Sequence, residues 1–482
     1  MGIEIGGEIE KVNGKELSYN EFVERYLSKN QPVLLTGLMD DWRACKDWVT
    51  ENGRPNLRFF STHFGKSRVQ IADCGTREFT DQRRIEMTVT EFINHWSEDF
   101  VSDCANGASR EGSDKSVLYL KDWHFVKEYP DYVAYRTPVF FCDDWLNLYH
   151  DHYRMHKDPD ISCQENNDIS CSDYRFVYMG AKGSWTPLHA DVFRSYSWSA
   201  NVCGKKRWLL LSPSQNHLVF DRHALGISHP ENLKNCVYNI LDDVNETKFP
   251  GFKKAIWLEC IQESNQIIFV PSGWYHQVHN LEDTVSINHN WFNAYNISWV
   301  WNLLLRDYEE AKEYIEDIRD ISDDFESLCQ RNLAANTGMN FIDFFVFLSR
   351  LFLANIGQLY YPNDENGSSS RISSSFSQHL ALNLTSIQMI SSKMKSMNLA
   401  GNDDFFVDWQ EILDDPEFSM LCVDVGRTYQ MIHKQQIETC DINKALIVDL
   451  IYYSPRIRTL KDFVIFIDTA LTKLGISYAK TF

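Results

Sequence analysis

From residue 185 to residue 191 the chain reads Trp-Thr-Pro-Leu-His-Ala-Asp, and strand-like segments stand on both sides of this stretch. In a β-strand, side chains two residues apart face the same side. The imidazole of His189 and the carboxylate of Asp191 are therefore able to reach one metal ion. A His-x-Asp or His-x-Glu pattern often arises by chance, so the surroundings of the pair must decide its meaning.

The same spacing occurs at two other places in the chain, which are His156 with Asp158 and His229 with Glu231. The first pair lies in a polar run, and a proline stands between the two residues of the second pair, so both are typical of loops. Only the pair at 189 and 191 lies among predicted strands.

A third candidate ligand is His276, which ends the run Pro271–His276 after an apolar strand and a Gly-Trp turn. Two histidines and one carboxylate leave three coordination positions open, which is the ligand set of non-haem iron(II) oxygenases. A closed zinc site would need a fourth ligand, preferably a thiolate, and the nearest thiol, Cys203, is discounted on strand phase. We expect His279 and His289 to be hydrogen-bonded core histidines, or to donate hydrogen bonds to the residues that bind the metal.

Polar residues alternate along the predicted strand at 195–202. Ser197, Ser199 and Asn201 share one face, which either lines a polar barrel interior or faces solvent. The basic turn that follows offers Lys206 as a partner for the far carboxylate of a dicarboxylate co-substrate. A solvated basic turn is the alternative.

The distribution of strand and helix signals predicts an α+β protein with three regions. Strand signals with Gly and Pro between them dominate residues 141–295, which favours a sandwich or barrel that carries the catalytic site. Residues 1–140 mix both signals and are expected to pack on the barrel. Residues 296–482 are helical, with a serine-rich mobile loop near 363–375.

Charge and composition restrict the partners of this chain. The net charge is −20, from 47 basic and 67 acidic residues. Such a surface repels phosphate backbones but tolerates a basic protein substrate, so no direct nucleic-acid binding is expected. No apolar run approaches the roughly 20 residues that span a bilayer. The N-terminus lacks a signal-peptide pattern, so we expect a cytoplasmic protein without membrane attachment.

The stretch 174–293 resembles the JmjC (jumonji) oxygenases, which depend on iron(II) and 2-oxoglutarate. It carries the His-x-Asp pair, the step from Lys206 to Trp208 and the run Gly273–His276. Four further segments are similar to one branch of that family, the branch of jumonji-domain-containing protein four: residues 119–124, 173–178, 189–195 and 278–284. That branch is similar to enzymes that hydroxylate a lysine in a translation-termination release factor.

The resemblance implies a double-stranded β-helix of the cupin or JmjC type with flanking helices. It implies that His189, Asp191 and His276 bind Fe(II) and that Lys206 holds the distal carboxylate of 2-oxoglutarate. The residues that it implies for the lining of the co-substrate pocket are Tyr178, Thr186, Ser199, Asn201 and Asn288. Many relatives carry Asn in place of Ser199 and Thr in place of Asn288.

The implied activity is a dioxygenase reaction that consumes dioxygen and 2-oxoglutarate and hydroxylates a protein side chain. The expected substrate is a lysine of a release factor. A JmjC histone lysine demethylase is one alternative, because the same cofactors serve both reactions. A non-catalytic cupin-like scaffold or binding protein is the alternative from another functional class.

Overall fold

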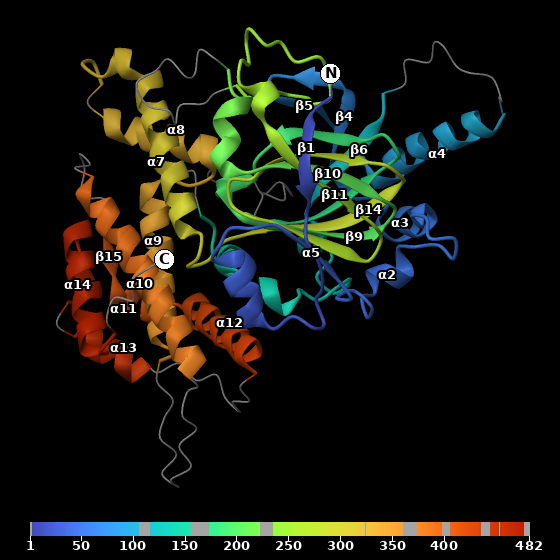
Figure 1. The fold of residues 1–482 in the computed structure, drawn as a ribbon. Coiled ribbons are helices and arrows are strands. Elements are labelled where there is room, and N and C mark those ends of the chain that lie inside the picture. Colours follow the sequence, from blue (N-terminus) through green and yellow to red (C-terminus); the bar gives the residue numbers. More distant parts are fainter. Residues whose placement is uncertain are drawn as a thin grey trace. The chain divides into compact units, whose positions relative to one another are not determined.

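The structure, a computed structural model, describes residues 2–105, 116–155, 173–221, 235–322, 324–359, 374–397, 405–434, 444–452 and 454–476 (Figure 1). The chain forms two compact units. The barrel unit comprises Met1–Pro138 and Tyr174–Asn290, and the helical unit comprises Val139–Asp173 and Trp291–Phe482. The three regions that the sequence analysis predicts, divided at residues 140 and 295, remain a prediction about domain boundaries. Most of the predicted loop at 363–375 lies outside the described residues.

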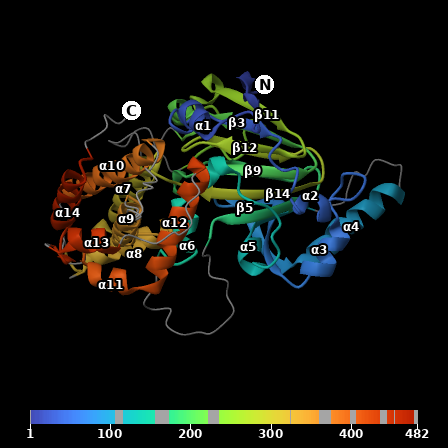
Figure 2. The same ribbon diagram turned by 90° about the horizontal axis from the view of Figure 1, so that it is seen from below.

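Two β-sheets make up most of the barrel unit. The order of the smaller sheet is β1 (Glu4–Glu8), β11 (Ile256–Gln262), β10 (Lys206–Leu211), β13 (Tyr275–Asn280) and β8 (Trp185–His189). The order of the larger sheet is β2 (Lys11–Asn13), β3 (Val33–Thr36), β12 (Gln266–Val270), β9 (Tyr196–Cys203), β14 (Thr284–Trp291), β7 (Arg175–Gly180), β6 (Leu118–Trp123), β4 (Arg68–Glu78) and β5 (Asp81–Thr88). Figure 2 shows β3, β12, β9 and β14 side by side in the larger sheet.

The chain changes sheet repeatedly between β8 and β14, which is the pattern of a jelly-roll barrel. A buried apolar cluster joins residues of both sheets, among them Leu210 and Val278 from the smaller sheet and Leu34 and Ile268 from the larger. All five residues of β12 are buried, since this strand lies between β3 and β9. The core therefore lies between the sheets, as the predicted double-sheet architecture requires.

Short helices and turns complete the barrel unit. They are α1 (Tyr19–Phe22), a π-helix (Val23–Leu27), α2 (Ala44–Asp47), α3 (Leu57–Phe64), α4 (Val89–Ala105), α5 (Phe125–Glu128) and 3-10 turns at Val192–Arg194, Pro213–Val219 and Phe252–Lys254. Ser18 and Glu21 form a capping box that starts α1. Strands of the N-terminal region are hydrogen-bonded members of both sheets, so this region supplies part of the barrel walls.

The helical unit is built around one apolar helix. Its elements are a 3-10 turn (Val139–Phe141), α6 (Trp145–His150), α7 (Ile297–Tyr314), a 3-10 turn (Glu316–Ile318), α8 (Phe325–Thr337), α9 (Phe341–Ile356), α10 (Ser374–Ser396), β15 (Val407–Asp408), α11 (Trp409–Asp414), α12 (Pro416–His433), α13 (Lys444–Ile451), β16 (Arg456–Ile457) and α14 (Leu460–Lys473). Helix α9 is buried along most of its length and contacts α10, α12 and α13. A helix that is apolar on all sides belongs inside a bundle.

No single helix among the described ranges has the length and apolar composition needed to cross a membrane. The helices α8 and α9 meet these criteria only when they are taken as a pair, across a bend of 70°.

Candidate metal centre

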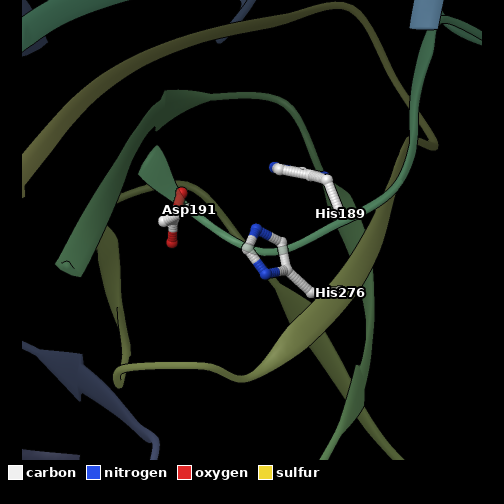
Figure 3. Close-up of side chains that lie close together, drawn as sticks. All are labelled: His189, Asp191 and His276. Atoms are coloured by element: carbon white, nitrogen blue, oxygen red, sulfur yellow. The ribbon is translucent and has the colours of Figure 1, made fainter. Parts of the chain in front are cut away.

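The three predicted metal ligands come together at one end of β8 and β13 (Figure 3). His189 and His276 are direct partners in the register of these antiparallel strands, and their ring centroids are 4.3 Å apart. Asp191 follows β8 by two residues. One ligand atom from each of the three residues lies within 4.8 Å of the others, and in the described part of the chain no other such group of His, Cys, Asp or Glu residues occurs.

The backbone around Asp191 turns sharply to bring the carboxylate back to the histidines. Asp191 is extended, with φ −58° and ψ 151°, and the 3-10 turn that follows holds Phe193 and Arg194 at φ 55° and 50°. Positive φ is uncommon for residues other than glycine. This turn leads the chain into β9, where the Ser197 hydroxyl donates a hydrogen bond of 2.7 Å to Oδ2 of Asp191. The carboxylate is thereby oriented from the neighbouring sheet.

The hydrogen bonds of the two histidines fix which ring nitrogen is free. Nδ1 of His189 lies 2.8 Å from the carbonyl oxygen of Pro187, and Nδ1 of His276 lies 3.1 Å from that of Trp274. A carbonyl oxygen only accepts, so each Nδ1 carries the proton and each Nε2 presents a lone pair. Burial, with the neighbouring His276, lowers the pKa of His189 to about 4, which keeps that ring neutral. The donor set therefore fits a divalent ion such as Fe(II).

The two histidines that the sequence analysis set aside lie outside this cluster. The ring of His279 is stacked on Trp185 with an interplanar angle of 4°, and its Nε2 lies 2.8 Å from Nε2 of Gln277. His289 is buried and hydrogen-bonds to the hydroxyl of Tyr135. The competing pairs 156/158 and 229/231 lie outside the described residues.

Lys206 is buried at the start of β10, with 1% of its surface exposed. Its Nζ donates a hydrogen bond of 3.1 Å to the hydroxyl of Tyr119, and among the described residues it has no carboxylate within ion-pair distance. Burial lowers the pKa of Lys206 to about 7, and the charge of Lys121 adds to this effect. The solvated residue of the basic turn is Lys205, which pairs with Glu263 and Glu282. The alternative of a solvated turn is therefore wrong for Lys206.

Several buried polar atoms on β9, β13 and β14 have no hydrogen-bond partner among the described residues. They include Ser199 Oγ, Asn201 Oδ1, Asn280 Oδ1 and Thr284 Oγ1. Asn280 lies directly opposite Lys206 in the pairing of β10 with β13. Unpartnered buried polar atoms are costly unless a ligand or water satisfies them. The polar face of β9 is therefore interior, and the solvent-facing alternative is wrong for Ser199 and Asn201, which are 3% and 0% exposed.

The remaining pocket residues from the sequence analysis are Tyr178, Thr186 and Asn288, and each has its own contacts in the structure. The hydroxyl of Tyr178 donates to Asp122 at 2.5 Å, and the Tyr178 ring packs edge-to-face on Tyr119. Thr186 lies on β8 opposite Val278. Asn288 donates to Ser286 Oγ at 3.2 Å. Within the described residues neither Thr186 nor Asn288 hydrogen-bonds to Lys206, so their role in co-substrate binding stays a prediction.

Sequence reasoning missed two residues of β6 that adjoin Lys206. Tyr119 accepts the hydrogen bond of Lys206, and Lys121 is a second buried lysine close by. The signal was present, because a lysine directly after the apolar run Leu118–Leu120 is unusual inside a strand and residues 119 and 121 share a strand face. Their proximity to Lys206 depends on the pairing of β6 with β7 and β4, which the sequence pattern does not give.

Comparisons with known proteins agree with this architecture. The cupin-like domain family matches residues 19–297. A relative from Arabidopsis thaliana, named arginine-specific demethylase JMJ20, is 59% identical over 450 residues that cover 93% of both chains. The 2-oxoglutarate and iron-dependent oxygenase JMJD4 of Danio rerio is 40% identical over 70% of this chain and 73% of its own. Its Homo sapiens counterpart is 36% identical over 69% and 72%.

Proposed function

The chain belongs to the cupin-like JmjC family of iron- and 2-oxoglutarate-dependent oxygenases, and we propose that it hydroxylates a lysine carbon in a protein substrate. The observation that carries the oxygenase activity is the pairing of two features in one barrel. A two-histidine, one-carboxylate cluster lies at the ends of β8 and β13. A buried lysine that has no carboxylate partner within the described ranges begins β10. A cupin-like protein that only binds a metal does not require the buried lysine.

In this proposal His189, Asp191 and His276 hold Fe(II), and Lys206 with Tyr119 holds the distal carboxylate of 2-oxoglutarate. The cofactors, when bound with dioxygen, supply the oxidation: 2-oxoglutarate becomes succinate and carbon dioxide while one oxygen atom enters a substrate C–H bond. The protein orients these groups. Ser197 fixes the Asp191 carboxylate, and the backbone carbonyls behind the histidines fix their rings.

Charge near the metal centre supports a cationic side chain as substrate. The carboxylates of Asp81 and Asp122 are part-exposed and both contact the guanidinium of Arg84, at 3.4 and 3.1 Å. Burial acts to raise the pKa of Asp81, but the charge of Lys121, a backbone hydrogen bond at Gln82 and the charge of Arg84 outweigh it, so the pKa of Asp81 is lowered. Asp81 begins β5, which contacts β8, the strand that ends at His189. A lysine or arginine side chain would be attracted to such carboxylates.

Within this class we propose a lysine of a translation-termination release factor in the cytoplasm. The support is the resemblance of residues 119–124, 173–178, 189–195 and 278–284 to the release-factor hydroxylase branch. The net charge of −20 favours a basic protein partner over nucleic acid.

Arginine demethylation is the second candidate function, favoured by the printed name of the relative that is 59% identical. Both reactions begin at a C–H bond. When the oxidised carbon is an N-methyl group, the product loses formaldehyde, whereas a hydroxylated side-chain carbon keeps its oxygen. The two products therefore differ in mass, and this difference separates the candidates.

The test supplies purified protein with Fe(II), 2-oxoglutarate and ascorbate, and offers three substrates separately: folded release factor, a methyl-arginine peptide and a methyl-lysine histone peptide. Mass spectrometry and formaldehyde release are measured against succinate production, with Asp191→Ala as the inactive control. We expect release factor to gain one oxygen per succinate formed. Formaldehyde release from a methylated peptide, matched to succinate and with release factor unmodified, would replace hydroxylation by demethylation. Absence of substrate-dependent succinate with all three would favour a non-catalytic protein.

A further inference from the structure

A second buried lysine lies in the barrel unit, and neither the metal cluster nor Lys206 accounts for it. Lys121 on β6 is 2% exposed, and its Nζ donates a hydrogen bond of 2.7 Å to the neutral side-chain oxygen of Gln82. An ammonium carries three N–H donors and no acceptor, so this bond uses one donor of three. Burial of an ammonium beside a neutral partner is costly, and it points to an anion that a ligand supplies.

The two carboxylates nearest to Lys121 in the sheet are engaged by other residues. Asp122, which directly follows Lys121, accepts a hydrogen bond of 2.5 Å from the Tyr178 hydroxyl and pairs with the guanidinium of Arg84 at 3.1 Å. Asp81 pairs with the same guanidinium at 3.4 Å. In the described part of the chain no carboxylate lies within ion-pair distance of Lys121. The ammonium of Lys121 is therefore without a direct counter-ion there.

The ring of Tyr119 connects Lys121 to Lys206. Nζ of Lys121 lies 5.3 Å and Nζ of Lys206 lies 5.7 Å from the centroid of this ring. Lys206 donates to the Tyr119 hydroxyl at 3.1 Å, so the phenol oxygen accepts and the phenol hydrogen remains to be donated to another oxygen atom. Two ammonium groups beside one ring repel each other. A carboxylate beside the ring would offset this repulsion and accept the phenol hydrogen.

The hydrogen bonds of Gln82 connect Lys121 to the same end of the barrel. Gln82 accepts from Lys121 and donates to the backbone carbonyl of Trp185, at 3.1 Å. Trp185 begins β8 and pairs with His279 on β13. The next residue of β13 lies directly opposite Lys206 on β10. The shared ring and this chain of contacts both lead from Lys121 to the Lys206 end of the strands.

We propose that Lys121 and Lys206 together hold the distal carboxylate of 2-oxoglutarate beside the ring of Tyr119. Burial is the main cause that lowers the pKa of Lys121 to about 8 and that of Lys206 to about 7, so each ammonium gains from an anion at this end. Two buried cations at one end make the site selective for a 2-oxo acid with a second carboxylate. This inference rests on the proposed function. The competing role for Lys121 is structural, in which it orients Gln82 and through it β8.

The experiment measures ligand binding without turnover. Protein loaded with Mn(II) in the absence of dioxygen is titrated calorimetrically with 2-oxoglutarate and with 2-oxopentanoate, which has the same carbon chain but lacks the distal carboxylate. The variants are Lys121→Gln, which keeps a hydrogen-bond donor for Gln82, Lys121→Met, Lys206→Met and the double variant with both methionines. Lys205→Met is the matched control, because it removes an adjacent lysine that is paired with glutamates on the surface. Circular dichroism checks that each variant is folded.

We expect Lys121→Gln, Lys121→Met and Lys206→Met each to bind 2-oxoglutarate about 30-fold more weakly, as for loss of one partner in a buried charge pair. Binding of 2-oxopentanoate should not change, because this compound has no distal carboxylate. The double variant should lose the preference for 2-oxoglutarate, since neither lysine then remains for the distal carboxylate. Lys205→Met should bind both compounds as the unsubstituted protein does.

Unchanged binding of both compounds in folded Lys121 variants would overturn the proposal in favour of the structural role, and so would a loss in Lys121→Met that Lys121→Gln does not share. Equal weakening of both compounds would also overturn it, since Lys121 would then act elsewhere than at the distal carboxylate. The same conclusion follows if the double variant prefers 2-oxoglutarate as strongly as Lys206→Met does. Failure of the unsubstituted protein to bind 2-oxoglutarate at all would overturn the proposed function as well.

Discussion

Each unit of the chain buries an ionisable side chain, and the two side chains differ in their hydrogen-bond partners. Asp143 of the helical unit is 0% exposed and accepts hydrogen bonds from Trp145 Nε1, Asn293 Nδ2 and His379 Nε2, at 3.1, 3.1 and 3.0 Å. Lys206 of the barrel unit is 1% exposed, and the hydrogen bond that its Nζ makes among the described residues goes to the neutral phenol of Tyr119. A fully bonded buried charge stabilises the fold around it, whereas an unpaired one destabilises it until a ligand binds.

The difference in hydrogen-bond partners distinguishes a buried residue that stabilises the fold from one that binds a ligand, and residue type alone does not make this distinction. Asp143 resembles an active-site acid by residue type, since it adjoins His379, which in turn lies 3.0 Å from His433. Its hydrogen-bonding capacity is nevertheless used by its own unit. Lys206 and Lys121 have no carboxylate within ion-pair distance in the part of the chain that the structure describes, and unpartnered polar atoms of Ser199, Asn201 and Asn280 occur in the same unit. The expected effects of substitution therefore differ in kind between the two units.

The largest effect is expected at the metal cluster. His189→Ala or Asp191→Ala should weaken Fe(II) or Mn(II) binding by more than about 100-fold and abolish 2-oxoglutarate turnover. Removal of a residue that binds the metal directly weakens metal affinity more than removal of a residue that only hydrogen-bonds to a ligand. Metal titration and succinate production provide the measurement, and His279→Ala is the control that keeps the cluster intact. Full turnover by Asp191→Ala would contradict the assigned ligand set.

The next effect is on stability and belongs to the helical unit. Asp143→Ala should lower the free energy of unfolding by about 3–5 kcal/mol, because three donors would lose a buried charged acceptor. Denaturant unfolding measures this, and Asp414→Ala on the exposed side of α11 should change the same quantity by less than about 0.5 kcal/mol. Equal effects of the two substitutions would show that the buried carboxylate contributes no net stability.

The corresponding change in the barrel unit should affect binding and leave stability intact. Lys206→Ala should raise the 2-oxoglutarate requirement by an amount equivalent to about 2–5 kcal/mol. Lys206→Met, which keeps a side chain of similar volume, should leave the free protein as stable as before or more stable. Lys206→Arg should not restore binding, since a planar guanidinium differs in shape and reach from an ammonium. If the 2-oxoglutarate requirement of Lys206→Ala equals that of the unsubstituted protein, another cation such as Lys205 or Arg194 holds the distal carboxylate.

The smallest effect is a pH dependence of stability in the helical unit. His152 lies between Asp424 and Glu417, at 3.0 and 3.1 Å, and the hydrogen bond to Asp424 is the main cause that raises its pKa. Its contribution is present below the unfolded pKa of about 6.5 and is lost as pH rises through the higher folded value. Melting curves between pH 5 and about 8 should therefore show a loss of up to about 1 kcal/mol that is absent in His152→Gln. An identical pH profile in both proteins would contradict this.

The sequence by itself determined the chemistry of the site. Strand periodicity paired His189 with Asp191, the Gly-Trp turn singled out His276, and the cation after the polar strand pointed to Lys206. Residue type and local period carry this information because ligand chemistry depends on the atoms present and a strand fixes which side they face. The strand spacing predicted a sandwich or barrel, and the resemblance to the JmjC oxygenases narrowed this to a double-stranded β-helix.

Only the tertiary structure decided which of two adjacent lysines is buried, since Lys205 and Lys206 have the same chemistry and differ in what packs around them. It also decided the register that sets His276 opposite His189, and it brought Tyr119 and Lys121 to Lys206 from a distant strand. Burial and cross-strand pairing depend on residues far away along the chain. A local pattern gives the side on which a residue faces, but its neighbours across the sheet are fixed only when the whole core has packed.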